Sequence, residues 1–119
     1  MTKQILIAED DMFLRDMMAA ALKEHGVDVR LAADGVEAVE EIDKKQPDLL
    51  LLDLLMPRKD GFFVLNHIKE KSYTFPVVII SNLSGDLTPQ KCFLIGAKDY
   101  LVKSDMDEDE LWPRIKKFL

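Results

Sequence analysis

Short apolar runs alternate with amphipathic stretches along the chain, and this alternation limits the possible folds more than any other feature. The apolar runs lie at Gln4–Ala8, Val27–Leu31, Asp48–Asp53, Pro76–Ser81 and Asp99–Val102. Each run has the length of a strand. The stretches between them carry apolar residues at three- and four-residue steps, the spacing of an amphipathic helix. Strands that alternate with helices indicate a parallel sheet covered by helices.

Capping residues and helix breakers place five helices among these strands. The expected positions, in order, are Met12–His25, the stretch from Asp34-Gly35 to the residue before Pro47, a helix starting at Gly61, a short helix from Thr88-Pro89 to Gly96, and a last helix with Leu111, Trp112, Ile115, Phe118 and Leu119 on one face. Pro113 lies too deep in the last helix for an ideal first-turn proline, so we expect an irregular opening turn there.

Strand composition predicts the order of the sheet. The strands that contain Ile5, Leu49 and Val77 are apolar on both faces, as buried central strands are. Val27–Leu31 alternates and Asp99–Val102 starts polar, so these two runs are expected at the edges. Right-handed crossovers then give the order 2-1-3-4-5. We therefore predict an α/β fold, a flavodoxin-like doubly wound parallel sheet of five strands with five helices.

Length and charge narrow the function classes. A chain of 119 residues fits one domain, residues 1–119. No apolar run approaches the ~20 residues of a membrane helix, and the N-terminus has no pattern of a signal peptide. The lone Cys92 fits a reducing compartment, so we expect a cytoplasmic protein with no membrane partner. A net charge of −6 argues against direct binding of nucleic acid.

Chemically active side chains follow the expected strands. Glu9 and Asp10 end the first strand, Asp53 the third, Ser81 the fourth and Lys103 the fifth. The carboxyl ends of parallel strands share one edge of the sheet, so these groups should converge. Clustered carboxylates repel one another, and oxygen ligands suit Mg²⁺, which bridges carboxylates to phosphoryl groups. An aspartate in such a site can act as a nucleophile and become an aspartyl phosphate.

Four segments together resemble the receiver domain of two-component response regulators. They are Ile5–Asp11, Leu51–Pro57 with Asp60-Gly61, Val78–Ser81 and Gly96–Lys103. The resemblance covers the whole chain. It implies a module that accepts a phosphoryl group on Asp53 from a sensor histidine kinase or a phosphotransfer protein. Such a module is not an enzyme with outside substrates, because it catalyses only its own phosphorylation and dephosphorylation.

The resemblance also implies a magnesium site. Asp10 would bind Mg²⁺ directly, and Glu9 would act through a water molecule. Asp53 would be both phosphoacceptor and metal ligand. Leu55 would lend its backbone carbonyl to the metal.

A switch is implied as well. Ser81 and Lys103 would contact the phosphoryl group, and Tyr100 would turn inward when Ser81 is drawn toward the phosphate. The surface of the fourth helix, fifth strand and fifth helix would then change its binding of a downstream protein, or form a homodimer. No output domain follows the last helix in this sequence, so we expect either a separate target or an output domain in a longer protein.

Three positions depart from the family's usual pattern. Ser104 follows Lys103 where the family usually has proline after a cis bond, and a cis bond before another residue costs ~2.5–4 kcal/mol, so we expect a trans bond. Asn82 replaces a very small residue and is expected to narrow the phosphoryl pocket. Leu55 is apolar and cannot orient an attacking water, so we expect a phosphoryl form that decays slowly.

Two alternative functions stay open. A degenerate receiver would bind partners without phosphorylation, and Asn82 is the main feature in its favour. A haloacid-dehalogenase-type phosphatase also uses an aspartate after an apolar strand. It requires a second aspartate two positions on, where this chain has Leu55. Nucleotide-binding enzymes would need glycine-rich phosphate loops, which the sequence lacks.

Overall fold

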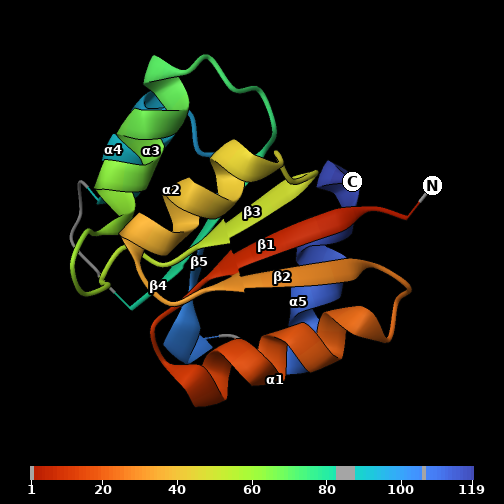
Figure 1. The fold of residues 1–119 in the computed structure, drawn as a ribbon. Helices are drawn as coiled ribbons and strands as arrows, with labels where there is room; N and C mark the ends of the chain where they lie inside the picture. The colour runs from red at the N-terminus through yellow and green to blue at the C-terminus, as the bar shows by residue number, and fades with distance from the viewer. Residues whose placement is uncertain (1, 83–87, 106) are drawn as a thin grey trace.

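The computed structural model describes residues 2–82, 88–105 and 107–119 (Figure 1). Its strands are β1 (Gln4–Ala8), β2 (Asp28–Ala32), β3 (Leu49–Leu52), β4 (Val77–Ser81) and β5 (Asp99–Val102). Its α-helices are α1 (Met12–Lys23), α2 (Gly35–Lys44), α3 (Gly61–Glu70), α4 (Thr88–Leu94) and α5 (Glu108–Ile115), and short 3₁₀ helices cover Lys103–Asp105 and Lys116–Phe118. Within the described ranges, no helix is both long and apolar enough to cross a bilayer.

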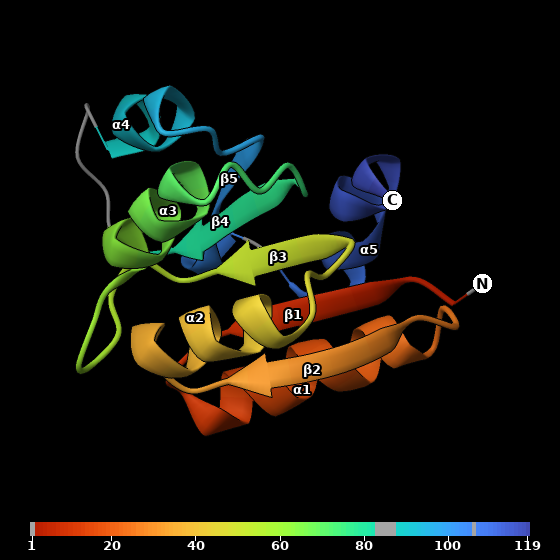
Figure 2. The ribbon, with the colours of Figure 1, turned by 45° about the horizontal axis from the view of Figure 1, so that its top comes forward.

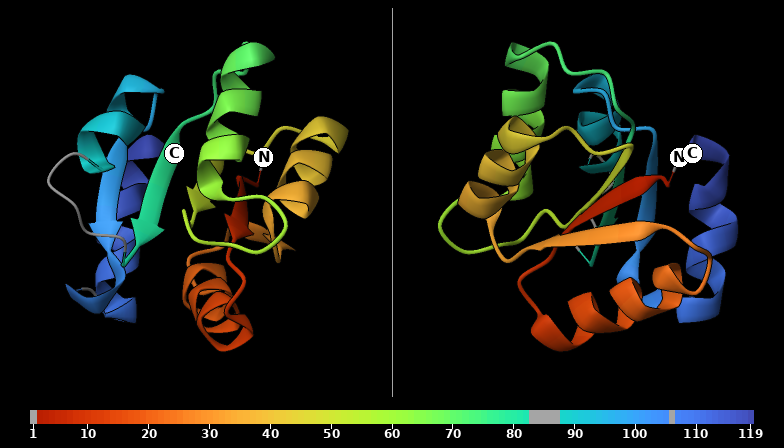
Figure 3. Two further views of the ribbon diagram at one scale, coloured as in Figure 1. Left: turned by 90° about the vertical axis from the view of Figure 1, so that its left-hand side faces the viewer. Right: turned by 45° about the vertical axis from the view of Figure 1, so that its right-hand side comes forward.

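The sheet has the order β2-β1-β3-β4-β5, and all neighbouring strands run parallel. This confirms the predicted strand order and fold class. Helices α2, α3 and α4 cover one face of the sheet, and α1 and α5 cover the other (Figure 2). Because the strands are parallel, their carboxyl ends lie at one edge, from which the loops to the helices leave (Figure 3).

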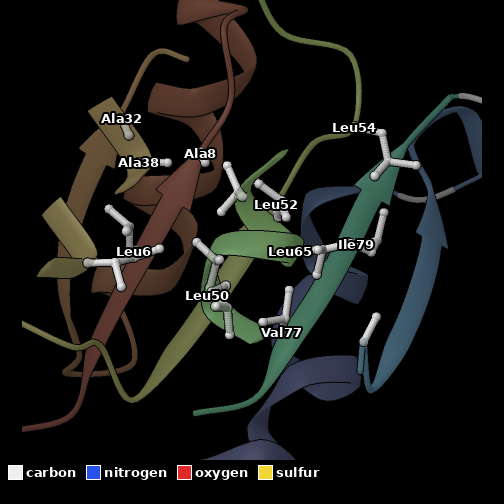
Figure 4. Packing of buried hydrophobic residues seen from close by; sticks show 14 of the residues in the cluster. Leu6, Ala8, Ala32, Ala38, Leu50, Leu52, Leu54, Leu65, Val77 and Ile79 are labelled. Atoms are coloured by element: carbon white, nitrogen blue, oxygen red, sulfur yellow. The ribbon is translucent and has the colours of Figure 1, made fainter. Parts of the chain in front are cut away.

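Alternate residues of the central strands supply two separate cores. Leu6 and Leu50 belong to the cluster that packs with α2, α3 and α4 (Figure 4). Ile5, Ile7 and Leu51 belong to the cluster that packs with α1 and α5. A strand buried on both faces must be apolar throughout, which is why these runs do not alternate. Full burial of each such side chain contributes about 1.5–3 kcal/mol.

An aspartate caps each of the helices α1, α2, α3 and α5. Each carboxylate accepts a hydrogen bond from a backbone N–H in the first turn of its helix: Asp11 for α1, Asp34 for α2, Asp60 for α3 and Asp107 for α5. Such a cap is typically worth about 1 kcal/mol. The caps of the first three helices fix where the chain turns from the carboxyl end of a strand into the next helix.

The prediction of an irregular opening turn in the last helix is wrong. Helix α5 opens regularly, because Asp107 accepts hydrogen bonds from the N–H groups of Asp109 and Glu110. Pro113 lies inside the helix. It lacks an N–H, so the carbonyl of Asp109 loses its helical donor while the opening turn stays intact. The other helices and strands differ from the expected bounds only at their ends.

Candidate functional site

Glu9 follows β1 and is only 1% exposed. Its Oε1 accepts a hydrogen bond from Lys103 Nζ at 2.8 Å and another from the backbone N–H of Asp11 at 3.2 Å. Burial raises the pKa of Glu9 to about 7, while the hydrogen bond from Lys103 opposes the shift and the charge of Asp53 adds to it. The carboxyl of Glu9 is therefore held in a site where its negative charge is only partly compensated.

Asp53 follows β3 and is also buried. Its Oδ2 accepts a hydrogen bond from Lys103 Nζ at 3.0 Å, and its Oδ1 accepts one from the Leu55 N–H at 3.3 Å. The backbone N–H of Asp53 donates to the Ala8 carbonyl at 3.0 Å. This last bond ties the end of β3 to the end of β1, so Asp53 and Glu9 come side by side.

Lys103 bridges these two carboxylates. Its side chain is mostly buried, and its Nζ lies 2.7 Å from Glu9 Oε2 and 3.0 Å from Asp53 Oδ2. Burial by itself would lower the pKa of Lys103, but the hydrogen bonds to Glu9 and Asp53 outweigh it and raise the pKa above its usual value. The ammonium is therefore a fixed positive charge at this edge of the sheet.

The donor set of the site fits a hard divalent cation. Carboxylate oxygens of Glu9, Asp10 and Asp53 lie within 4.8 Å of one another. Asp10 is exposed, whereas the other two are buried. Three carboxylates face one ammonium, so a cation would relieve the remaining repulsion. Oxygen ligands of this kind suit Mg²⁺.

Ser81 and Tyr100 lie on the neighbouring strands β4 and β5. Ser81 ends β4 and is fully buried, and Tyr100 lies on β5 and packs against the core on the α2–α4 face. Burial raises the pKa of Tyr100, and a side-chain hydrogen bond with Ser81 opposes the shift. The structure thus brings into contact the two residues that the sequence assigns to the switch.

The three departures from the family pattern have distinct positions. The Lys103–Ser104 bond is trans, as predicted. The side chain of Leu55 is 57% exposed, in the loop after β3. Asn82 is exposed, and its Oδ1 accepts a hydrogen bond from the Ser104 backbone N–H at 2.9 Å. The side chain of Asn82 therefore has a specific partner, which the sequence does not reveal.

A further ion pair connects the loop after β3 to the start of α2. Arg58, with φ of +62°, donates from Nε to Asp34 Oδ2 at 2.7 Å and from a terminal nitrogen to Oδ1 at 3.1 Å. The N–H of Gly35 donates to the Lys59 carbonyl at 2.9 Å, and a Cβ at Gly35 would lie 2.3 Å from that oxygen. This ion pair was not predicted from the sequence. The glycine after Asp34 was the one local sign of a close approach.

Comparison with known sequences points to one family. A family model described as "Response regulator receiver domain" matches residues 5–116. Response regulator RR06 of Streptococcus pneumoniae serotype 2 is 39% identical over 99 residues, which cover 83% of this chain and 45% of that protein. The chain thus spans less than half the length of this relative.

Solved structures show the same fold. The receiver domain of the Francisella response regulator 1452 has a TM-score of 0.91 and 29% identity, covering 98% of this chain and 96% of that one. A chain in the crystal structure of the CheX–CheY–BeF3–Mg complex from Borrelia burgdorferi has a TM-score of 0.89 and 29% identity, covering 98% and 90%. These similarities extend over nearly the whole of this chain.

Proposed function

Because the chain belongs to the family of response regulator receiver domains, we propose that it is the phosphoacceptor module of a two-component system and that Asp53 is the acceptor. The observation that carries the proposal is the contact of the Lys103 ammonium with the buried carboxylates of Asp53 and Glu9. A sensor histidine kinase or a phosphotransfer protein would supply the phosphoryl group, since receiver domains interact with proteins of these classes.

The transfer would proceed as an in-line displacement. A carboxylate oxygen of Asp53 attacks phosphorus, and a phosphorus–oxygen bond forms as the phosphorus–nitrogen bond of a phosphohistidine breaks. The electron pair stays with the departing imidazole nitrogen, which is protonated from solvent. Lys103 neutralises one phosphoryl oxygen and the Ser81 hydroxyl donates to another. The protein contributes position and charge, which is what phosphoryl transfer mostly requires.

The acidic cluster would hold Mg²⁺. Asp10 and Asp53 would be direct ligands, Glu9 would act through a water molecule, and Leu55 would supply its backbone carbonyl. When bound, Mg²⁺ neutralises charge that builds up on the phosphoryl oxygens. Without a cation, the carboxylates of the cluster oppose the approach of an anionic phosphoryl donor.

Phosphorylation of Asp53 would change the conformation of the protein through Ser81 and Tyr100. When Ser81 turns its hydroxyl toward a phosphoryl oxygen, its hydrogen bond with Tyr100 has to change. Movement of Tyr100 would then alter the surface formed by α4, β5 and α5. We propose that this surface binds a downstream protein or a second copy of the chain, or contacts an output domain in a longer, cytoplasmic protein. On this account the chain turns over no outside substrate.

The test is phosphoryl incorporation from a small donor. The protein is incubated with Mg²⁺ and acetyl phosphate, and its intact mass is followed. We expect a gain of one phosphoryl group, absent with EDTA and absent in Asp53→Asn, which keeps the shape of the side chain. No gain in the wild-type protein would favour the degenerate receiver instead. A gain in Asp53→Asn would place the acceptor elsewhere.

A further inference from the structure

The pairing of β4 with β5 continues beyond the last pair of its ladder. The ladder ends at Ser81 opposite Val102. Beyond this pair, the backbone N–H of Ser104 donates to Asn82 Oδ1 at 2.9 Å. A side chain from the loop after β4 thus takes the role of a backbone carbonyl and carries the connection into the loop after β5.

This hydrogen bond joins the neighbours of two site residues. Asn82 directly follows Ser81, which is fully buried at the end of β4. Ser104 directly follows Lys103, whose ammonium contacts Asp53. Ser104 also lies in the 3₁₀ helix Lys103–Asp105, so a restraint on its N–H restrains the backbone from which the Lys103 side chain leaves.

We infer that Asn82 is a positioning residue, which sets the spacing between the Ser81 hydroxyl and the Lys103 ammonium by holding the Ser104 N–H. This inference rests on the proposed function, because it assigns the spacing a role in phosphoryl transfer. Groups held in place before the reaction need no reorganisation when charge develops, so a looser Lys103 slows the transfer.

The hydrogen bond between Ser104 and Asn82 also links two of the departures from the family pattern. A proline at position 104 would have no N–H to donate, and Asn82 would then have no partner there. With Ser104 the donor exists, and the amide of Asn82 reaches it. The side chain of Asn82 is therefore hydrogen-bonded to the backbone next to Lys103. From the sequence it was expected only to narrow the phosphoryl pocket.

A double-mutant cycle tests the coupling. The rate of phosphoryl incorporation from acetyl phosphate with Mg²⁺ is measured for the wild type, Asn82→Ala, Ser104→Pro and the double variant. We expect the effect of Asn82→Ala to be about two- to tenfold more unfavourable in the wild type than in Ser104→Pro, because only the wild type loses a neutral hydrogen bond. If the size of the side chain at position 82 affects how easily the phosphoryl donor reaches Asp53, that effect is the same in both backgrounds and cancels in the cycle.

Two further measurements isolate the hydrogen bond. Ser104→Ala keeps the backbone N–H, so its rate should equal that of the wild type. Amide hydrogen exchange by NMR needs no phosphorylation and no proline, and we expect the Ser104 amide to exchange several-fold faster in Asn82→Ala than in the wild type. Thermal unfolding followed by circular dichroism checks that each variant is folded.

The outcomes separate this inference from the proposed function. A wild-type protein that takes up no phosphoryl group overturns both. If the wild type is phosphorylated but Asn82→Ala has the same effect in both backgrounds, only the positioning role is overturned. Unchanged exchange of the Ser104 amide in Asn82→Ala also overturns it. Coupled rates together with faster exchange support it.

Discussion

The ammonium of Lys103 lies 3.0 Å from Oδ2 of Asp53, although 50 positions separate the two residues in the chain. The contact depends on the sheet, which brings the end of β3 and the end of β5 to one edge. It places a positive charge at the oxygen atoms where a phosphoryl group would be attached. Because the charge is already in place, its stabilisation of a phosphoryl-transfer transition state would cost no reorganisation.

Lys103→Met tests the role of this charge. The substitution keeps an unbranched side chain and removes the ammonium between Glu9 and Asp53. We expect phosphoryl incorporation to slow by about 10²-fold or more, as for the loss of one preorganised donor. Mg²⁺ binding should persist, because the carboxylates lose a competing cation. Intact-mass time courses and calorimetric Mg²⁺ titrations measure the two effects.

A matched control is Lys98→Met, which removes an exposed ammonium close to the amino end of β5. Its rate of incorporation should equal that of the wild type. The role assigned to Lys103 would be wrong if Lys103→Met and Lys98→Met were phosphorylated equally fast.

Leu55 is expected to prolong the phosphoryl form. Its apolar side chain, 57% exposed, follows Asp53 by two positions and has no group that could orient an attacking water. Leu55→Asn supplies such a group, so its aspartyl phosphate should decay faster than that of the wild type. Loss of the phosphoryl group is followed by intact mass after the donor is removed. Decay of the wild-type form within seconds would refute this expectation.

Gly61 is expected to be indispensable for the shape of the acceptor loop. A Cβ at this position would lie 2.5 Å from the Asp53 carbonyl oxygen and 2.8 Å from the Cα of Leu54. Both contacts are with backbone, so the loop itself would have to shift. We expect Gly61→Ala to lower the free energy of unfolding by about 1–3 kcal/mol, as overpacking does, and to slow phosphoryl incorporation. Urea unfolding measures the first effect.

The control for this change is Gly26→Ala. Gly26 has a φ of +79° and open space around its Cβ position. Its substitution should therefore cost only the left-handed backbone penalty, about 1–2 kcal/mol, with no change in the rate of phosphorylation. Equal phosphorylation rates in the two variants would show that the contact at Gly61 does not shape the site.

The ion pair of Asp34 and Arg58 predicts a pH-dependent contribution to stability. Hydrogen bonds from Arg58 hold the pKa of Asp34 below its ordinary 3.8. Since the folded state favours the ionised carboxylate, the stabilisation is complete above the unfolded-state pKa. It is lost as the pH falls through the lower pKa of the folded state.

Asp34→Asn isolates this charge, because asparagine is also a good helix cap. Arg58 is largely exposed to solvent, which screens the pair. We therefore expect the variant to lose about 0.5–1 kcal/mol at pH 7. Urea unfolding at pH 7 and in steps below pH 4 should show the difference between variant and wild type shrinking with falling pH. A constant difference would mean that the charge of Asp34 is not its cause.

Much of the fold could be predicted because its causes are local or periodic. Central strands such as β1 and β3 are apolar on both faces, and that pattern is enough to place them in the middle of the sheet. The convergence of Glu9, Asp53 and Lys103 followed from the strand order alone, because parallel strands end at one edge.

The contacts between loops could not be predicted in this way. The bond between Asn82 and Ser104 depends on the conformations of two loops that are far apart in the sequence. The pair of Asp34 and Arg58 depends on a positive φ at Arg58, which no local signal announces. Such contacts depend on how the loops lie relative to one another in the folded protein, and a local sequence pattern does not specify that arrangement.

The most direct test of the account is to locate the phosphoryl group. After incubation with Mg²⁺ and acetyl phosphate, borohydride reduces an aspartyl phosphate to homoserine, and mass spectrometry of the peptides identifies the changed position. The account predicts homoserine at position 53, formed with Mg²⁺ and absent with EDTA. Homoserine at Asp10 or Asp11 instead, or a phosphoester on Ser81, would contradict it.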